Sequence, residues 1–254
     1  MLVYPSGVDV SGSALRFLTQ QLRRHRRAIG SRWRRLSAGR QALLTLAHLR
    51  VGHTYAQLAA GFGVSTTTAY RYVTEAVELL AALAPGLADA VRTGSSKAYL
   101  ILDGTLLPID RIAADRPFYS GKHQRHGMNM QVIADPFGRL LWASPALPGA
   151  VHDIRAARAH GILDALADAA IPCWADKAYR GAGGTVRTPY WGRWETLSAG
   201  QKAVNRSHAK IRALGEQAVG TLKSWRLLRK LRCSTTRITK LVQAVLAFHL
   251  TSSE

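Results

Sequence analysis

The 254-residue chain is short of acidic residues, of cysteine and of long apolar runs. It has 15 Asp and Glu against 35 Lys and Arg, which gives a net charge of +20. Two cysteines, Cys173 and Cys233, support neither a disulfide framework nor a cysteine zinc site. The longest late apolar stretch, 241–250, is interrupted by polar residues and is too short to span a membrane. These absences disfavour a disulfide-rich secreted protein and a membrane protein.

The charge of the chain indicates its class of partner. A pI near 11.0 requires a polyanion, and an apolar content of 47% indicates a folded protein rather than a disordered basic tail. The first residues after Met1 lack the basic segment and the apolar core of a secretion signal. We therefore expect a cytoplasmic protein that binds nucleic acid and no membrane.

Three segments differ in composition, and the first, residues 1–39, is strongly basic. Nine arginines occur in residues 1–40, and no acid follows Asp9 there. A solvated helix face of this composition would repel itself, because no acid compensates its charge. We interpret the segment as a basic arm or helix that contacts DNA phosphates.

The second segment, 40–92, predicts a small all-α domain with a helix-turn-helix. Ala59 is small enough for two helices to approach, Gly63 suits the turn, and Ser65 suits the cap of the next helix. That helix would offer polar side chains to a DNA groove, and the candidate contacts are Ser65, Thr66, Thr67, Thr68 and Arg71. A plain helical hairpin is the alternative interpretation.

The third segment, 97–250, alternates strand and helix patterns. Apolar runs predict strands at 98–103 and 106–111 with a tight turn at Gly104-Thr105 between them. Further patterns predict a hairpin of 128–134 with 139–143, a helix at 151–170, a strand at 171–176 and a helix at 207–229. Hairpins followed by helices that alternate with a strand indicate an α/β (mixed α+β) layer fold.

Three carboxylates stand out in this basic chain. Asp103 and Asp176 each end an apolar run, and Glu216 lies in a helical stretch that is otherwise free of acid. Carboxylates on rigid strand ends suit Mg²⁺, and a pair of such ions can assist phosphodiester displacement. Taken singly, the three acids fit a turn, a helix cap and a surface ion pair with Arg212 equally well.

Residues 98–232 resemble the DDE transposases of bacterial insertion sequences, in the group related to Harbinger-type elements. The resemblance implies an RNase H-like catalytic domain, with a mixed sheet flanked by helices, after a small helix-turn-helix domain. Its motifs are specific only in combination: Asp103-Gly104-Thr105, Tyr119-Ser120-Gly121-Lys122-His123, Pro148-Gly149-Ala150-Val151-His152-Asp153, Ala175-Asp176-Lys177-Ala178-Tyr179, Arg212-Ala213-Leu214-Gly215-Glu216, and Lys223 seven residues after the glutamate.

The resemblance implies a role for each matching residue. It makes Asp103, Asp176 and Glu216 the catalytic, metal-binding triad for Mg²⁺ or Mn²⁺, with two ions expected. Asp153 competes with Asp176 and is expected to support the ligands rather than to bind metal. The DNA contacts that the resemblance implies in this segment are Lys122, His123, Arg212 and Lys223.

The implied function is that of a DNA transposase with metal-dependent strand cleavage and strand transfer. It would bind the terminal inverted repeats of its element and the target DNA, as a homodimer or larger assembly, at the bacterial nucleoid. Two alternatives stay open. One is a helix-turn-helix regulator that has lost catalysis, and the other is a general RNase H-like nuclease.

Overall fold

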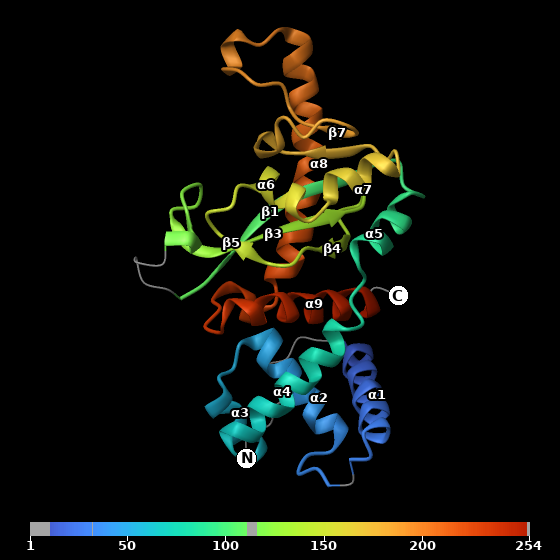
Figure 1. The fold of residues 1–254 in the computed structure, drawn as a ribbon, viewed down its shortest axis with the longest axis vertical. Coiled ribbons are helices and arrows are strands. Elements are labelled where there is room, and N and C mark those ends of the chain that lie inside the picture. The colour runs from blue at the N-terminus through green and yellow to red at the C-terminus, as the bar shows by residue number, and fades with distance from the viewer. Residues whose placement is uncertain (1–10, 32, 111–115, 253–254) are drawn as a thin grey trace. The chain divides into compact units, whose positions relative to one another are not determined.

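The computed structural model describes residues 11–31, 33–110 and 116–252 (Figure 1). The chain divides into two compact units, one from Met1–Ala84 with Lys223–Glu254 and the other from Pro85–Leu222. The chain after Leu222 is grouped with the first unit, and the segments 1–39, 40–92 and 97–250 stay a prediction of the functional domains.

The described part of the first unit is built from helices. Its elements in chain order are α1 (Gly12–Ala28), α2 (Ala38–Leu46), the π-helix η1 (Ala47–Val51), α3 (Tyr55–Phe62), α4 (Thr66–Ala81), the 3₁₀-helix η5 (Arg226–Arg229) and α9 (Thr235–Ser252). The prediction of a helical second segment is therefore confirmed over α2, α3 and α4.

The turn between α3 and α4 has the predicted chemistry. Gly63 ends α3 in the left-handed region with φ of 66°, a conformation that costs glycine little. Val64 is buried beyond the turn, and the Ser65 hydroxyl accepts a hydrogen bond from the Thr68 amide at 3.2 Å. These three residues fix the angle between the two helices.

Helix α9 joins this unit because its apolar face packs on α4 and α1. Ile238, Val242 and Phe248 are fully buried there, and each such side chain contributes about 1.5–3 kcal/mol. At the edge of this contact, Arg237 donates a hydrogen bond to the Thr74 hydroxyl at 2.8 Å. The C-terminal residues thus complete the helical core.

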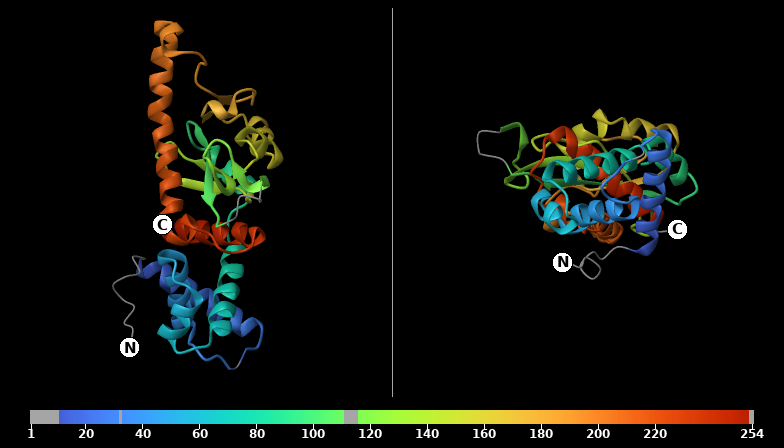
Figure 2. Two further views of the ribbon diagram at one scale, coloured as in Figure 1. Left: turned by 90° about the vertical axis from the view of Figure 1, so that its left-hand side faces the viewer. Right: turned by 90° about the horizontal axis from the view of Figure 1, so that it is seen from below.

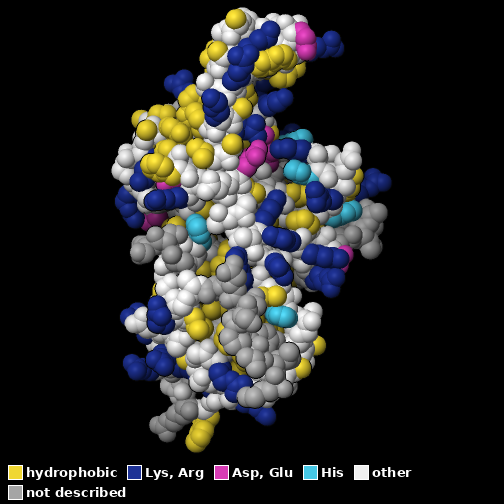
Figure 3. All heavy atoms as spheres, turned by 180° about the vertical axis from the view of Figure 1, so that it is seen from behind, with side chains coloured by type: hydrophobic (Ala, Val, Ile, Leu, Met, Phe, Trp, Pro, Cys, Tyr) yellow, Lys and Arg dark blue, Asp and Glu magenta, His cyan; other side chains and the backbone are white. Residues whose placement is uncertain are grey.

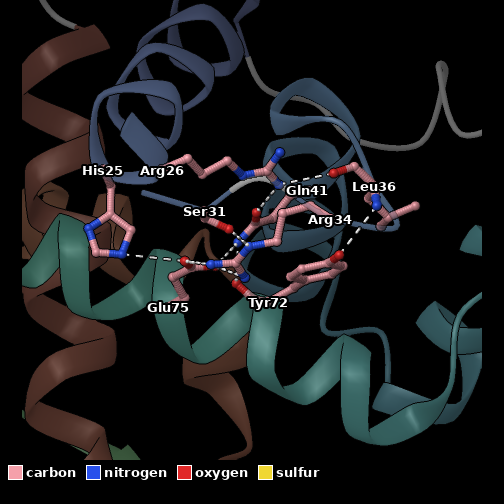
Figure 4. Close-up of polar contacts among 8 residues, drawn as sticks. All are labelled: His25, Arg26, Ser31, Arg34, Leu36, Gln41, Tyr72 and Glu75. Atoms are coloured by element: carbon pink, nitrogen blue, oxygen red, sulfur yellow. Dashed lines mark hydrogen bonds and ion pairs between the residues drawn. The ribbon is translucent and has the colours of Figure 1, made fainter. Parts of the chain in front are cut away.

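Part of the predicted basic arm serves the fold instead of DNA. Figure 4 shows Arg34 reaching the Glu75 carboxylate with two hydrogen bonds, of 2.8 and 3.2 Å. His25 lies 3.4 Å from the same carboxylate, and Arg26 donates to the backbone of Leu36 and to Gln41. The missing compensating acid comes from α4, so the phosphate interpretation is wrong for these three side chains. Arg32 and residues 1–10 lie outside the described residues.

We predict that Glu75→Ala destabilises the helical unit by about 3 kcal/mol, because Arg34 and Gln41 lose the acceptor they share. Glu78→Ala is the control, since Glu78 is half exposed and forms an ion pair with the exposed Lys240. Its cost should be at most about 1 kcal/mol. Urea unfolding measures both, and equal losses in the two variants would contradict the prediction.

The second unit is a mixed sheet with helices on both faces. Its strands are β1 (Leu100–Pro108), β2 (Tyr119–Ser120), β3 (Arg125–Ala134), β4 (Leu140–Ala143), β5 (Leu147–Pro148), β6 (Cys173–Ala175) and β7 (Val186–Arg187). Strand β1 is antiparallel to β3 and parallel to β6, β4 and β5 add antiparallel to β3, and β6 is parallel to β7. The predicted mixed α/β fold is confirmed.

Helices cover the sheet as Figure 2 shows. Helices α6 (Asp153–Ala159) and α7 (Ile162–Asp168) lie on one face, and α8 (Ala199–Lys223) runs along the other. Helix α5 (Leu87–Gly94) packs against α7 and β4. The short 3₁₀-helices of this unit are η2 (Arg116–Phe118), η3 (Lys177–Tyr179) and η4 (Trp194–Thr196).

The predicted turn at Gly104-Thr105 is wrong, because β1 runs through both residues and stays paired with β3. Glycine is needed there for space rather than for a turn. A Cβ on Gly104 would lie 2.4 Å from the Asp153 Oδ1 atom, closer than any contact can be. The end of the predicted strand at Arg111 lies outside the described residues.

Two predicted helices have different bounds. The one expected at 151–170 is split into α6 and α7, because Gly161 takes a left-handed φ of 67°. The one expected at 207–229 begins earlier and ends at Lys223, after which Trp225 turns inward to stack on Phe248. The hairpin of β3 and β4 is confirmed, and its turn is tied by amides that donate to the Asp135 carboxylate.

Candidate active site

Parallel pairing of β1 with β6 brings Asp103 and Asp176 side by side. Leu102 pairs with Ala175, so the next residue of each strand is one of these acids. The Asp176 carboxylate accepts a hydrogen bond from the Ala178 amide at 2.7 Å, and Asp103 accepts one from Gly104 at 2.9 Å. Both carboxylates are therefore fixed by backbone amides, Asp103 within the central strand β1 and Asp176 directly after β6.

The surroundings of Asp103 perturb its carboxyl group. Burial and, next in size, the charge of Asp176 raise the pKa of Asp103 from its ordinary 3.8 to about 6. The Gly104 amide and the charges of Arg212 and Lys122 oppose this rise but do not cancel it. The ionised form of Asp103 is therefore disfavoured at this position.

Two basic side chains approach the pair. The Lys122 ammonium lies 2.8 Å from Asp153 and 3.8 Å from Asp176, and the Arg212 guanidinium lies 4.0 Å from Asp176. Partial burial opposes the charged form of Lys122, yet the three aspartates raise its pKa above the ordinary value. The predicted DNA contacts Lys122 and Arg212 thus lie at the carboxylates.

Asp153 is buried beside the pair and is the best-satisfied of the three aspartates. Its Oδ1 accepts a hydrogen bond from the Asn129 amide at 2.8 Å, while Lys122 takes Oδ2. Behind it, Gln131 donates to Asn129 at 2.8 Å, and the buried Tyr179 hydroxyl donates to Gln131. This relay fixes Asp153 from inside the sheet.

Sequence reasoning missed Asn129 and Gln131 as parts of the site. Both alternate with apolar residues in the otherwise apolar run 128–134, and both are buried. Side chains two apart on a strand point to the same face. Two buried amides in that spacing are a signal for a polar site on one face of the sheet.

Glu216 is not brought into the cluster. Its neighbour Gly215 packs closely on β1, where a Cβ would lie 2.9 Å from Ile101 Cγ2 and 3.7 Å from the Asp103 Cβ. The Glu216 side chain itself is exposed. Across the described residues, no group of three or more His, Cys, Asp and Glu side chains is close enough to hold a metal ion.

Helix α8 carries Glu216 and Arg212, and it contacts the sheet next to Asp176. His208 is buried and its Nε2 lies 2.7 Å from the carbonyl oxygen of Ala175, the residue before Asp176. The ring of His208 also meets Trp174 edge-on at 5.0 Å. This contact and the close packing of Gly215 on β1 fix the position of α8 along the sheet.

The donor chemistry of the pair fits a hard divalent cation. Asp103, within β1, and Asp176, directly after β6, offer carboxylate oxygens from neighbouring strands, and burial together with the charge of Asp176 raises the pKa of Asp103. Mg²⁺ and Mn²⁺ prefer such oxygens and are often held by one or two carboxylates. These two carboxylates fit a cation of this kind, and Asp103, Asp176 and Glu216 as metal ligands stay a prediction.

A cavity of about 450 Å³ opens beside the cluster. Lys122, His123, His152 and Asp153 line it, together with the Gly149-Ala150 turn. The cavity therefore joins two predicted DNA contacts to the acidic cluster. Gly149 cannot carry a side chain here, because a Cβ would lie 2.5 Å from the Gly127 carbonyl oxygen.

Comparison with known proteins decides the family. Residues 102–249 match the family described as DDE superfamily endonuclease, and residues 34–86 match the helix-turn-helix of DDE superfamily endonuclease. The chain belongs to the DDE superfamily of endonucleases. It is also similar to the "Putative transposase for insertion sequence element IS112" of Streptomyces albus G, with 33% identity over 199 residues, which cover 76% of this chain and 71% of that protein.

In this DDE superfamily endonuclease, the predicted groove contacts of α4 differ in availability. Thr66, Thr67 and Arg71 are exposed at the start of the helix. The hydroxyls of Ser65 and Thr68 bond each other at 2.9 Å and cap the helix. Ser65 and Thr68 therefore cap the start of the helix, while the side chains of Thr66, Thr67 and Arg71 are exposed to solvent. The predicted contact Lys223 ends α8 and is grouped with the helical unit.

The surface of the DDE endonuclease is strongly basic. Figure 3 shows many Lys and Arg side chains and few acids on one face. No helix among the described residues is long and apolar enough to cross a membrane.

We predict that Asp103→Asn stabilises the metal-free protein near neutral pH. A raised folded pKa means that the native state holds the proton more tightly than the unfolded chain. Stability therefore falls as pH rises from about 4 through 6. The gain should be on the order of 2 kcal/mol at about pH 7.5 and near zero at about pH 4. Urea unfolding at both pH values measures it, and an equal gain at both would contradict the assignment.

Proposed function

We propose that this protein is the DNA transposase of an insertion sequence. The observation that carries the proposal is the pair Asp103 and Asp176, adjacent on β1 and β6 in a DDE endonuclease fold. A helix-turn-helix in the same chain and a net charge of +20 support DNA as the substrate. The similarity to a putative transposase of an insertion sequence supports the same proposal.

In this proposal, Asp103 and Asp176 hold Mg²⁺ or Mn²⁺, with two ions during reaction. When bound, the metal would activate the attacking oxygen and stabilise the leaving oxygen at the scissile phosphate. The rigid strands keep the two carboxylates at a fixed separation, and the backbone amides of Gly104 and Ala178 orient them. Little reorganisation is then needed when substrate arrives.

Glu216 is proposed as the third ligand, delivered by α8. Gly215, the residue before Glu216, packs closely on β1, where a Cβ would lie 3.7 Å from the Asp103 Cβ, and this supports the proposal. The exposed, flexible side chain can turn toward the pair once a cation is there to attract it. Arg212, one turn earlier, already lies 4.0 Å from Asp176 and is proposed to meet DNA phosphate.

Asp153 is proposed to position Lys122 rather than to bind metal. Asn129 and Lys122 already use both of its oxygens, whereas Asp176 has one short bond and two long ion pairs. Lys122 and His123 would then bind the DNA strand in the adjoining cavity. This division of roles favours Asp176 over Asp153 as the partner of Asp103.

The helical unit is proposed to recognise the terminal inverted repeats through Thr66, Thr67 and Arg71, with Ser65 and Thr68 capping the recognition helix. The sheet unit would cleave at the element end and join the freed 3′ hydroxyl to target DNA. Two ends must be processed together, which requires a homodimer or a larger assembly on DNA.

We predict that Asp103→Asn, Asp176→Asn and Glu216→Gln each reduce strand cleavage by at least about 100-fold and leave DNA binding largely intact. The control is Asp164→Asn, which removes an exposed acid of α7 in the same unit and should cleave normally. Cleavage of an end-containing duplex with Mg²⁺ or Mn²⁺ measures it. Normal cleavage by the triple variant would overturn the assignment.

A separate prediction distinguishes the two aspartates next to Lys122. Asp153→Asn should lower cleavage by about 10- to 100-fold and keep measurable activity, as expected for a group that orients others. Asp176→Asn should leave no measurable activity. Metal titration of the cleavage rate compares them, and a complete loss in Asp153→Asn with retained activity in Asp176→Asn would reverse the roles.

The same assays separate the two alternatives. A regulator without catalysis would bind the repeats without metal and nick nothing. A general nuclease would cut duplexes that lack the element ends and would join no strands. Cleavage that requires the ends, followed by joining, is the result that supports a transposase.

A further inference from the structure

The loop between β7 and α8 carries large aromatic side chains that the fold leaves exposed. Tyr190, Trp191 and Trp194 are 51%, 73% and 47% exposed. Figure 1 shows this loop, in orange, beside the first turns of α8 and beyond the sheet. Clustered aromatic side chains on the surface of a folded unit mark a place where a partner binds. We call these three side chains the aromatic platform.

The loop under the aromatic platform is tied down. The Tyr190 amide donates to the Asn205 side chain at 2.8 Å, and the Asn205 side-chain amide donates back to the Tyr190 carbonyl oxygen at 3.1 Å. Gly192 has a φ of 146°, which favours glycine, and a Cβ there would lie 3.2 Å from the buried Leu197. A partner therefore meets a surface that is already ordered.

Basic side chains lie over the tryptophan rings. The Arg180 guanidinium is 4.7 Å from the centre of the Trp191 ring, and the Arg206 guanidinium is 5.5 Å from that of Trp194. Lys202, one turn before Arg206, is 5.8 Å from the Trp194 ring centre. These cations orient the rings but do not cover them, because Trp191 keeps 73% of its surface exposed.

The charge of this part of the chain indicates an anionic occupant. Residues 180–210 contain six Lys and Arg and one acid, Glu195. A second copy of the chain would bring the same positive segment and would be repelled. A polyanion would be attracted, so the charge favours nucleic acid over a second copy.

The aromatic rings distinguish an unpaired strand from a duplex. Bases inside a duplex stack on each other and show a protein only their edges in the grooves. An unpaired base has a free face, which stacks on an aromatic ring whatever the base is. Cations next to such rings suit the phosphates of the same strand. The composition of the platform therefore fits unpaired DNA.

The platform is close in the chain to the candidate active site. Its segment starts directly after Asp176, and α8 brings Arg212 back to 4.0 Å from the same carboxylate. Arg206, which lies over the Trp194 ring, is six residues before Arg212 on α8. This spacing is about 9 Å along the helix axis. It equals about three stacked nucleotides of a strand.

We propose that the aromatic platform stacks on unpaired bases of the DNA strand that is bound at Asp103 and Asp176. The basic side chains over the rings would contact phosphates of that strand. The inference rests on the proposed function and adds the form of DNA next to the site, which is locally unpaired.

The test compares full-length Trp191→Leu/Trp194→Leu with wild type. Leucine keeps the apolar character of both positions and removes the rings. Affinity for a labelled single-stranded oligonucleotide of mixed sequence is measured by fluorescence anisotropy without divalent metal, across a range of salt. It should fall about 10-fold or more, with an unchanged salt slope, because stacking is lost and phosphate contacts remain. Affinity for the matching duplex should change by less than about 2-fold.

Two control variants separate stacking from other effects. Trp191→Phe/Trp194→Phe keeps aromatic rings and should stay within about 3-fold of the wild-type affinity for the single strand. Phe137→Leu removes another exposed ring of the same unit, which has Arg139 at 5.7 Å over it, and should bind as wild type does. Thermal unfolding shows that each variant is folded.

Three results would overturn the inference. The first is unchanged single-strand affinity in the leucine variant, or an equal loss in the leucine and phenylalanine variants. The second is an equal loss for the duplex and the single strand, which assigns the platform to paired DNA. The third is a wild type that is dimeric without DNA and a leucine variant that is monomeric with unchanged affinity, which assigns the platform to a second copy.

The proposed function is tested separately in the cleavage assay. Wild-type cleavage that requires the element ends, with unchanged single-strand affinity in the leucine variant, overturns the platform and leaves the transposase proposal standing. A loss of about 10-fold in the leucine variant, with no cleavage of element ends by wild type, supports stacking and overturns the transposase proposal.

Discussion

The rest of the site depends on one constraint, the parallel pairing of β1 with β6. This pairing puts Asp103 beside Asp176, where burial and the charge of Asp176 disfavour the ionised form of Asp103. The resulting strain is electrostatic, and a cation relieves it. Lys122 and Arg212 relieve it partly, at 3.8 and 4.0 Å from Asp176.

Two acids of this basic chain, Glu75 and Asp153, each bind more than one basic or amide side chain. Glu75 gathers His25, Arg34 and Gln41 and so ties the helical unit together. Asp153 gathers Lys122 and Asn129 and so shapes the sheet site. Most other cations remain for the surface, where a polyanion can meet them. A few acids thus determine which basic side chains are bound within the fold and which stay at the surface.

Much of this architecture could be predicted from local patterns. Gly63 and Ser65 predict the helix-turn-helix, and the apolar runs before Asp103 and Asp176 predict the strands β1 and β6. The turn predicted at Gly104 was wrong, because the sequence does not distinguish a glycine that makes room for Asp153 from a glycine that allows a turn. The role of Glu75 and the packing of α9 on α4 could not be predicted, since both depend on contacts between distant parts of the chain.

The central claim is that Asp103 and Asp176 together hold a divalent cation. Binding of Mn²⁺ to the full-length protein, measured by calorimetry or electron paramagnetic resonance near neutral pH, tests it without any assumption about DNA. Wild type and Asp164→Asn should bind Mn²⁺, and the Asp103→Asn/Asp176→Asn double variant should lose this binding. Equal Mn²⁺ affinity in the wild type and the double variant would contradict it.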